Sequence, residues 1–143
     1  MAHEFTTTRR VEFAETDLAG IAHFANFFRW MESAEHEFFR SLGLAVHGDL
    51  AGVEYGFVRV HAECDYKRPL HYGELVTIDL VVSKKTSKAM TYEFMFRGDD
   101  LSTPAALGKL DVVHVTRPGG ADDQRLRATD IPEEIARQLD VAP

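Results

Sequence analysis

The sequence contains a single cysteine, Cys64, and this scarcity limits the chemistry open to the chain. One cysteine cannot form a disulfide within the chain, and no CxxC element is present for metal binding or redox exchange. The N-terminus lacks a basic stretch followed by an apolar one, and no run approaches the roughly 18 apolar residues of a membrane-spanning helix. We therefore expect a cytoplasmic protein without a secretion signal or a membrane span.

Basic residues are also in the minority. The chain has 23 Asp and Glu against 16 Lys and Arg, a net charge of −7, which disfavours a general nucleic-acid or anionic-membrane binder. With 143 residues, of which 45% are apolar, the chain has the size of one domain. We expect that domain to span residues 1–143, with a core over about 5–117 and a C-terminal tail.

Motifs that define several enzyme classes are missing. There is no GxGxxG or GxxxxGK[ST] loop for nucleotide phosphates, and no GxSxG element for a serine nucleophile. The seven histidines include no HExxH motif and no paired Glu-x-x-His elements. We therefore expect no metal site.

The most informative stretch is ETDLAGIAHFANFFRW, from Glu15 to Trp30. Asp17 and Gly20 fit the first and fourth positions of a type I turn, in which a short carboxylate accepts backbone N–H bonds. One interpretation is therefore an aspartate that only stabilises a turn. The other is a reactive carboxylate beside apolar surface, because residues 18–28 contain no Asp, Glu, Lys or Arg.

A long helix is predicted after this turn. Apolar residues recur at spacings of three and four, which is typical of a helix with one apolar face. They are Phe24, Phe27, Phe28, Met31, Ala34, Phe38 and Leu42, and Gly43 is the expected stop. Because the first N–H groups of a helix have no partner inside it, His23 to Asn26 should offer donors to a developing oxyanion. Asn26 is expected to cap or brace the helix start.

Glu35 interrupts the apolar face of this helix. At about 100° per residue it falls near the middle of the apolar stripe, and a buried carboxylate needs a partner. Two interpretations remain open. Glu35 forms an ion pair with an Arg or Lys, within the chain or across a subunit contact, or it is a second catalytic acid or base.

The rest of the chain alternates with a period of two, as in strands. The predicted strands are Phe5 to Phe13, Tyr55 to Tyr66, Glu74 to Thr86, Met90 to Phe96 and Leu107 to Arg117. The third and fourth should form a hairpin around a Lys-rich turn, and Leu44 to Glu54 should be a Gly-containing connection. Asp130 to Leu139 should form a short, peripheral helix capped by Asp130, with Glu133 three residues later.

These residues resemble a known family. Asp17, Gly20, Phe24, Asn26, Trp30, Glu32 and Ser41-Leu42-Gly43 are similar to the 4-hydroxybenzoyl-CoA thioesterase group of the hotdog superfamily, and the likeness continues through Tyr66-Lys67-Arg68-Pro69 and Gly73. It covers roughly residues 5–117. The resemblance implies an α+β hotdog fold, in which a curved antiparallel sheet of about five strands wraps a long central helix. It also implies acyl-CoA sites at the subunit interfaces of a homodimer or homotetramer.

The resemblance implies an acyl-CoA thioesterase, which hydrolyses the thioester of an aromatic or fatty acyl-CoA to free acid and CoA. Asp17 would be the nucleophile or general base, and the helix N-terminal amides would form the oxyanion hole. Coenzyme A enters as part of the substrate, and no separate cofactor is expected. Several bacterial members have a histidine where this chain has Phe24, and this chain departs from that pattern because its histidine, His23, stands one place earlier. His23 and, from its place on the helix, Glu35 are the further catalytic candidates.

The substrate side of the predicted site has two parts. The acyl group should contact Gly20, Phe24, Ala25, Asn26, Phe27 and Phe28, and Phe24-Ala25-Asn26 is most similar to the dihydroxynaphthoyl-CoA hydrolase branch, which favours an aromatic acyl group. The CoA phosphates should attract Lys67, Arg68, Lys84, Lys85 and Lys88, although the last three also suit a solvated turn. The competing functions are a non-catalytic acyl-CoA or acyl-carrier-binding hotdog protein and a hotdog hydratase or dehydratase.

Overall fold

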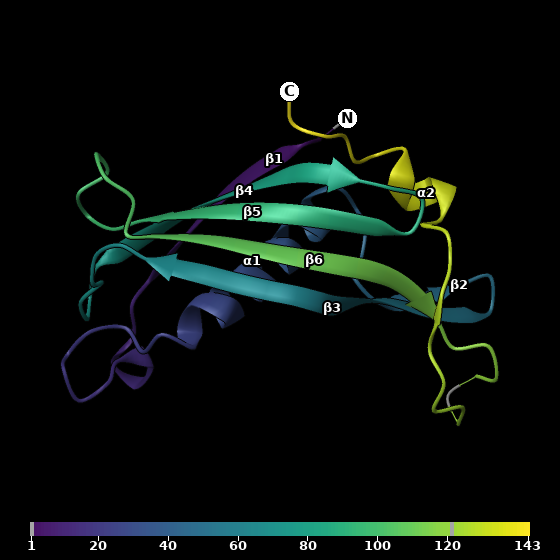
Figure 1. Ribbon diagram of the computed structural model, residues 1–143, viewed down its shortest axis with the longest axis horizontal. Helices are drawn as coiled ribbons and strands as arrows, with labels where there is room; N and C mark the ends of the chain where they lie inside the picture. Colours follow the sequence, from purple (N-terminus) through teal and green to yellow (C-terminus); the bar gives the residue numbers. More distant parts are fainter. Residues whose placement is uncertain (1, 121) are drawn as a thin grey trace.

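The computed structural model describes residues 2–120 and 122–143, which form a curved antiparallel sheet with helix α1 across one face (Figure 1). The strand order is β1-β4-β5-β6-β3-β2, and β7 pairs with the end of β6. The strands are β1 (Glu4–Arg10), β2 (Gly48–Leu50), β3 (Val53–Tyr66), β4 (Leu75–Lys85), β5 (Ala89–Arg97), β6 (Ala106–Thr116) and β7 (Arg127–Ala128). The predicted architecture is confirmed. The described residues form seven strands instead of about five, because β2 and β7 are too short to show a period.

Alternating apolar residues of β4 and β5 line the inner face of the sheet. Val76, Ile78, Leu80 and Val82 are buried on β4, and Met90, Tyr92, Phe94 and Phe96 are buried on β5. The two strands pair antiparallel, with Leu80 opposite Phe94 and a shift of register between Val82 and Lys84, so the predicted hairpin is confirmed. Each such apolar side chain contributes about 1.5–3 kcal/mol on burial, which holds this face against α1.

Helix α1 (Asn26–Ser41) packs on this inner face. Its buried side includes Trp30 and Met31, and it ends as predicted before Gly43, whose φ is 73°. A side chain at Gly108 of β6 would collide with Met31, so glycine lets the helix approach the middle of the sheet. Within the described residues, no helix is both long and apolar enough to cross a membrane.

Two connections differ from the sequence prediction. Strand β1 ends at Arg10 rather than Phe13, because Phe13–Glu15 forms a short 3₁₀ helix, η1, in which Glu12 N donates to Glu15 Oε1 at 2.9 Å. The expected loop over 44–54 contains strand β2, which turns tightly into β3 through Gly52, with a φ of 83°. In both places, local hydrogen bonds outweigh the apolar pattern.

The C-terminal tail contains a shorter helix than predicted, and more of the tail is buried. Helix α2 (Glu133–Ala136) begins after Pro132, so Asp130 is not its cap. The tail is not peripheral, because its apolar residues Ile131, Ile135 and Leu139 are buried in the core. Burial of these side chains fixes the tail over the end of the β4–β5 hairpin, where α2 lies in Figure 1.

Candidate active site

Asp17 lies at the corner of a tight hairpin that runs from Thr16 to Ala22. Gly20 N donates to Asp17 O at 3.0 Å, and Asp17 N donates to Ile21 O at 2.9 Å. A further bridge joins Thr16 and Ala22. Gly20 has a φ of 81°, a left-handed conformation that glycine adopts at little steric cost and that closes this three-residue loop. The predicted turn is confirmed.

The two carboxylate oxygens of Asp17 have different surroundings. Oδ1 accepts a hydrogen bond from Ala19 N at 2.9 Å, which is the turn-stabilising role. Oδ2 accepts no hydrogen bond from any residue in 2–120 or 122–143. The side chain is exposed and lines a pocket of about 410 Å³. One oxygen therefore supports the loop while the other is free to act on a ligand.

Two segments far apart in the sequence form this pocket. The first is the Asp17 hairpin with the start of α1, and the second is the last residue of β3 with the stretch that follows it. Ala22 N donates to Leu70 O at 2.7 Å, and Ile21 bridges to His71, so the segments are held side by side. The lining residues are Asp17, Ile21, Ala22, Phe24, Phe27, Tyr66, Lys67, Arg68, Pro69 and Leu70.

The pocket contains part of the predicted site. It brings together Asp17, Phe24, Phe27, Lys67 and Arg68, whereas Gly20, Ala25, Asn26 and Phe28 are not among its lining residues. Sequence reasoning missed Ile21, Ala22, Tyr66, Pro69 and Leu70, although the motif beginning at Tyr66 was a signal for this segment.

Tyr66 fixes one wall of the pocket. Its hydroxyl donates to Phe24 O at 2.9 Å, and its ring meets the Phe27 ring edge-on at a centroid distance of 5.1 Å. Partial burial, with a smaller contribution from Cys64, raises the pKa of Tyr66 to about 12. The phenol therefore stays protonated and keeps its bond to Phe24 throughout the neutral pH range.

The start of α1 offers fewer free donors than predicted. His23 N donates to Glu15 O at 2.8 Å, Asn26 N donates to His23 O at 3.0 Å, and Ala25 N donates to His23 Nδ1 at 3.2 Å. The prediction of free amides is therefore wrong at these three positions, because the chain forms a bonded turn before the helix begins. Phe24 N has no acceptor among the described residues, and Phe24 lines the pocket.

Comparison with known proteins identifies the family. A family model described as the thioesterase-like superfamily matches residues 11–139. The chain belongs to this superfamily. A putative esterase of Aquifex aeolicus (strain VF5) is 30% identical over 135 residues, covering 94% of this chain and 97% of the relative. A 1,4-dihydroxy-2-naphthoyl-CoA hydrolase of Prochlorococcus marinus (strain NATL2A) is 27% identical over 115 residues, covering 76% and 72%.

The solved structure of a 4-hydroxybenzoyl-CoA thioesterase has the same fold as this member of the superfamily. It superposes with a TM-score of 0.81 at 20% identity, and the match covers 95% of this chain and 98% of the other. The predicted hotdog fold is therefore confirmed. The predicted class of enzyme, a thioester hydrolase, is confirmed at the level of the family.

The structure does not bring His23 to the pocket of this thioesterase-like protein. The side chain is exposed and stacks on Phe24 at a centroid distance of 4.6 Å, while its Nδ1 accepts the bond from Ala25. The residues that the structure describes contain no group of three His, Cys, Asp or Glu side chains that could hold a metal ion.

Glu35 lies outside the pocket, in the core between α1 and the sheet. Its side chain is fully buried, and Oε1 accepts from Arg59 Nη2 on β3 at 2.5 Å, so the ion-pair interpretation is confirmed within the chain. Burial raises the pKa of Glu35, and Arg59 opposes that shift. Glu35 Oε2 and the Tyr92 hydroxyl are both buried without a hydrogen-bond partner among the described residues.

The predicted CoA-binding residues fall at two ends of the molecule. Lys67 and Arg68 line the pocket, whereas Lys84, Lys85 and Lys88 lie around the β4–β5 turn, near α2 in Figure 1. The 11 residues of β4 separate these ends by about 33 Å, at 3.3 Å per residue. Lys85 Nζ donates to two carbonyls of the tail, at 3.0 and 2.5 Å. Of the predicted CoA-binding residues, only Lys67 and Arg68 therefore lie at the pocket of the same protomer.

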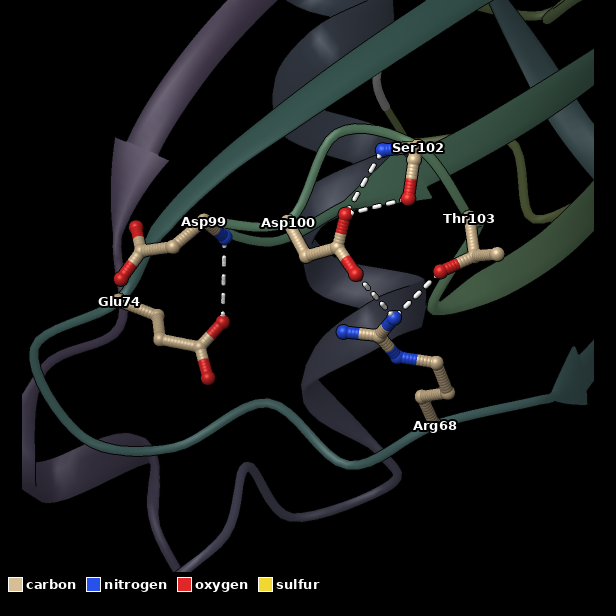
Figure 2. A network of polar contacts seen from close by, with 6 residues as sticks. All are labelled: Arg68, Glu74, Asp99, Asp100, Ser102 and Thr103. Atoms are coloured by element: carbon tan, nitrogen blue, oxygen red, sulfur yellow. Dashed lines mark hydrogen bonds and ion pairs between the residues drawn. The ribbon is translucent and has the colours of Figure 1, made fainter.

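Arg68 is held by the loop between β5 and β6 (Figure 2). Its Nη1 donates to Asp100 Oδ2 at 2.9 Å and also to Thr103 Oγ1. Hydrogen bonds from Ser102 and Arg68 lower the pKa of Asp100 to about 2, so this partner is charged at neutral pH. Lys67 is exposed and has no side-chain hydrogen bond or ion pair among the described residues. Lys67 is therefore the cation of the pocket wall that lacks a partner within residues 2–120 and 122–143.

Proposed function

We propose that this protein hydrolyses an acyl-CoA thioester, with Asp17 as the reacting carboxylate. The observation that carries the proposal is the pocket itself, in which a carboxylate with one unbonded oxygen shares apolar walls with Phe24, whose amide lacks an acceptor. The leaving thiol has a pKa of about 8.5, so the sulfur departs as thiolate with little help from a general acid. One carboxylate and one oxyanion donor therefore suffice for the reaction.

Asp17 has two routes to the product. As a nucleophile, Oδ2 attacks the carbonyl carbon, the C–S bond breaks, CoA leaves as thiolate, and water hydrolyses the resulting mixed anhydride. As a general base, Asp17 takes a proton from a water molecule whose oxygen attacks the same carbon. In both routes the carbonyl oxygen gains negative charge, which the Phe24 N–H stabilises. A single donor of this kind contributes about 100-fold to 1000-fold in rate.

The acyl group that fits this pocket best is aromatic. Phe24, Phe27 and Tyr66 supply three aromatic walls, against which a ring can stack or meet edge-on. The volume of about 410 Å³ lies within the usual range of small-molecule sites. The relationship to a 1,4-dihydroxy-2-naphthoyl-CoA hydrolase supports the same class of substrate.

The test is an assay of thiol release with aromatic, short-chain and long-chain acyl-CoAs. We expect release from all classes that enter the pocket, with kcat/KM at least about tenfold higher for the aromatic thioesters. Each aromatic contact of the acyl ring adds about 1 kcal/mol, so two such contacts exceed the roughly 1.4 kcal/mol that corresponds to tenfold. An Asp17→Asn variant is the matched control. A wild-type protein that binds acyl-CoA without releasing thiol would instead favour the non-catalytic acyl-binding function.

The exposed edge of β3 supports a homodimer. β3 pairs with β6 along its length, but on its other side it pairs with β2 only through Val53–Tyr55, so 56–66 has no partner strand among the described residues. Val60 is 61% exposed on this edge. Because an unpaired edge of this length favours strand pairing, we propose that two copies join through β3, next to Tyr66. A solution mass of 16.1 kDa at micromolar concentration, the mass of one chain, would contradict this dimer.

Lys67 is expected to attract the phosphates of CoA at the pocket mouth. A Lys67→Gln variant should have a KM for acyl-CoA about threefold to tenfold higher at low salt, with kcat unchanged, because only binding loses a cation. The difference should shrink as salt screens the charge. Lys84→Gln makes the same charge change at the other end of the sheet and should leave KM unaltered. Equal KM values for Lys67→Gln and the wild type at low salt would remove Lys67 from the site.

A further inference from the structure

Glu15 contacts α1 through both its side chain and its main chain. Its Oε2 accepts a hydrogen bond from Trp30 Nε1 at 2.7 Å, and its carbonyl oxygen accepts one from Asn26 Nδ2 at 2.7 Å. Both donors lie in the first two turns of α1 and are buried. Two separate bonds therefore tie a residue of η1 to the rigid start of the long helix.

The same residue also joins the elements on either side. Its carbonyl accepts from His23 N at 2.8 Å, and its Oε1 accepts from Glu12 N at 2.9 Å. Arg9 Nη2 of β1 lies 3.6 Å from Oε2, and the Arg9 guanidinium sits 5.8 Å from the centroid of the Trp30 ring. The side chain of Glu15 is only 15% exposed, so these charge-assisted bonds are shielded from water.

These contacts converge on the two ends of the Asp17 hairpin. The chain enters the hairpin directly after Glu15 and leaves it at His23, whose amide returns to the Glu15 carbonyl. The Asp17 carboxylate itself bonds to Ala19, inside the hairpin. The 70–71 segment holds the returning side of the hairpin, through Ala22 and Ile21. The tie between the hairpin and α1 runs through the ends of the hairpin, and both ends meet at Glu15.

We propose that Glu15 is a positioning residue, which anchors the hairpin on α1 and thereby sets the place of the Asp17 carboxylate relative to the Phe24 amide. The catalytic consequence rests on the proposed function, whereas the anchoring does not. When Glu15 loses its charge, the bonds to Trp30, Glu12 and Arg9 cannot all be kept. A shift of about 1 Å in a reacting group can cost up to about 100-fold in rate.

The test is the Glu15→Gln variant, which keeps the shape of the side chain. We expect kcat for thiol release to fall by about 10-fold to 100-fold, with KM within about threefold of the wild type. Hydrogen exchange at the Asp17 and His23 amides should accelerate, while protection in β4 and β5 should stay unchanged. Glu4→Gln is the matched control, because it removes the same charge from an exposed position on β1 and should alter neither kcat nor exchange.

A second variant tests the same anchor if the Glu15→Gln protein does not fold. Trp30→Phe keeps an aromatic ring but removes the indole N–H, and it should lower kcat and loosen the same two amides. Unchanged kcat and unchanged exchange in the folded variant would overturn the proposal, as would an equal loss of protection in the hairpin and in the core strands. If Asp17→Asn retained full activity, the proposed function would fail, and exchange at His23 would still decide the anchoring role.

Discussion

Replacing Asp17 with asparagine should lower kcat for acyl-CoA hydrolysis by about 100-fold to 10,000-fold, the usual contribution of a reacting acid or base. Asparagine has nearly the same shape, and its carbonyl oxygen can still accept the bond from Ala19 N, so the hairpin is retained. The uncharged amide, however, neither attacks a thioester carbonyl nor accepts a proton from water. The rate of thiol release under saturating substrate measures this loss.

A second turn aspartate provides the control for this experiment. Asp49 Oδ1 accepts from Gly52 N at 2.8 Å in the turn between β2 and β3. In Figure 1, β2 lies at the opposite end of the sheet from the loop that precedes α1, which carries Asp17. Asp49→Asn makes the same chemical change in a comparable turn, and it should leave kcat within about twofold of the wild type. Equal, undiminished rates for both variants would show that Asp17 only stabilises its turn.

The local part of the candidate site could be predicted from the sequence. The turn from Asp17 to Gly20 follows from residue preferences over four positions, and the end of α1 just before Gly43 follows from a single helix stop. The start of α1 was predicted too early, because the apolar spacing includes Phe24. The amide of His23 instead bonds to Glu15, and the helix begins only at Asn26.

Contacts between distant segments could not be predicted from such patterns. Lys85 was expected to contact CoA, but its ammonium group bonds to carbonyls of Ala136 and Leu139, which the buried tail brings to the end of β4. Glu15 lies 15 residues before Trp30, and no periodicity links them, since the contact depends on how η1 packs on α1. Glu35 was correctly predicted as buried, but its partner, 24 residues later on β3, could not be identified.

Removing the partner of Glu35 is expected to have the largest effect on stability. An Arg59→Met variant keeps an apolar stem of similar length but leaves the fully buried carboxylate without a counter-charge. Breaking a buried ion pair in this way costs about 3–5 kcal/mol. We expect about 3 kcal/mol, the lower end, because the Arg59 side chain is 26% exposed and the ion pair is partly screened. Urea unfolding monitored by Trp30 fluorescence gives the free energy of unfolding.

The double variant Glu35→Met with Arg59→Met separates the buried charge from the loss of packing. Since apolar side chains of similar volume can replace a buried ion pair at little cost, the double variant should recover most of the lost stability. Glu32→Gln removes the exposed carboxylate that lies 3.6 Å from Arg59 and should change stability by less than about 0.5 kcal/mol. A double variant as unstable as Arg59→Met alone would assign the loss to packing instead.

The pH dependence of the same variant tests the cause. Burial raises the pKa of Glu35 above its usual value of 4.5, so the folded state retains a proton that the unfolded state has already lost. The contribution of Glu35 to the free energy of unfolding is therefore highest at pH values below 4.5 and falls as pH rises toward the folded-state pKa.

Without Arg59 the folded-state pKa of Glu35 rises further, because the opposing guanidinium is gone. The destabilisation by Arg59→Met should consequently be small in acid, where Glu35 is neutral in both proteins, and should grow toward neutral pH. A pH-independent difference would mean that Arg59 stabilises the core through its hydrocarbon stem rather than through its charge.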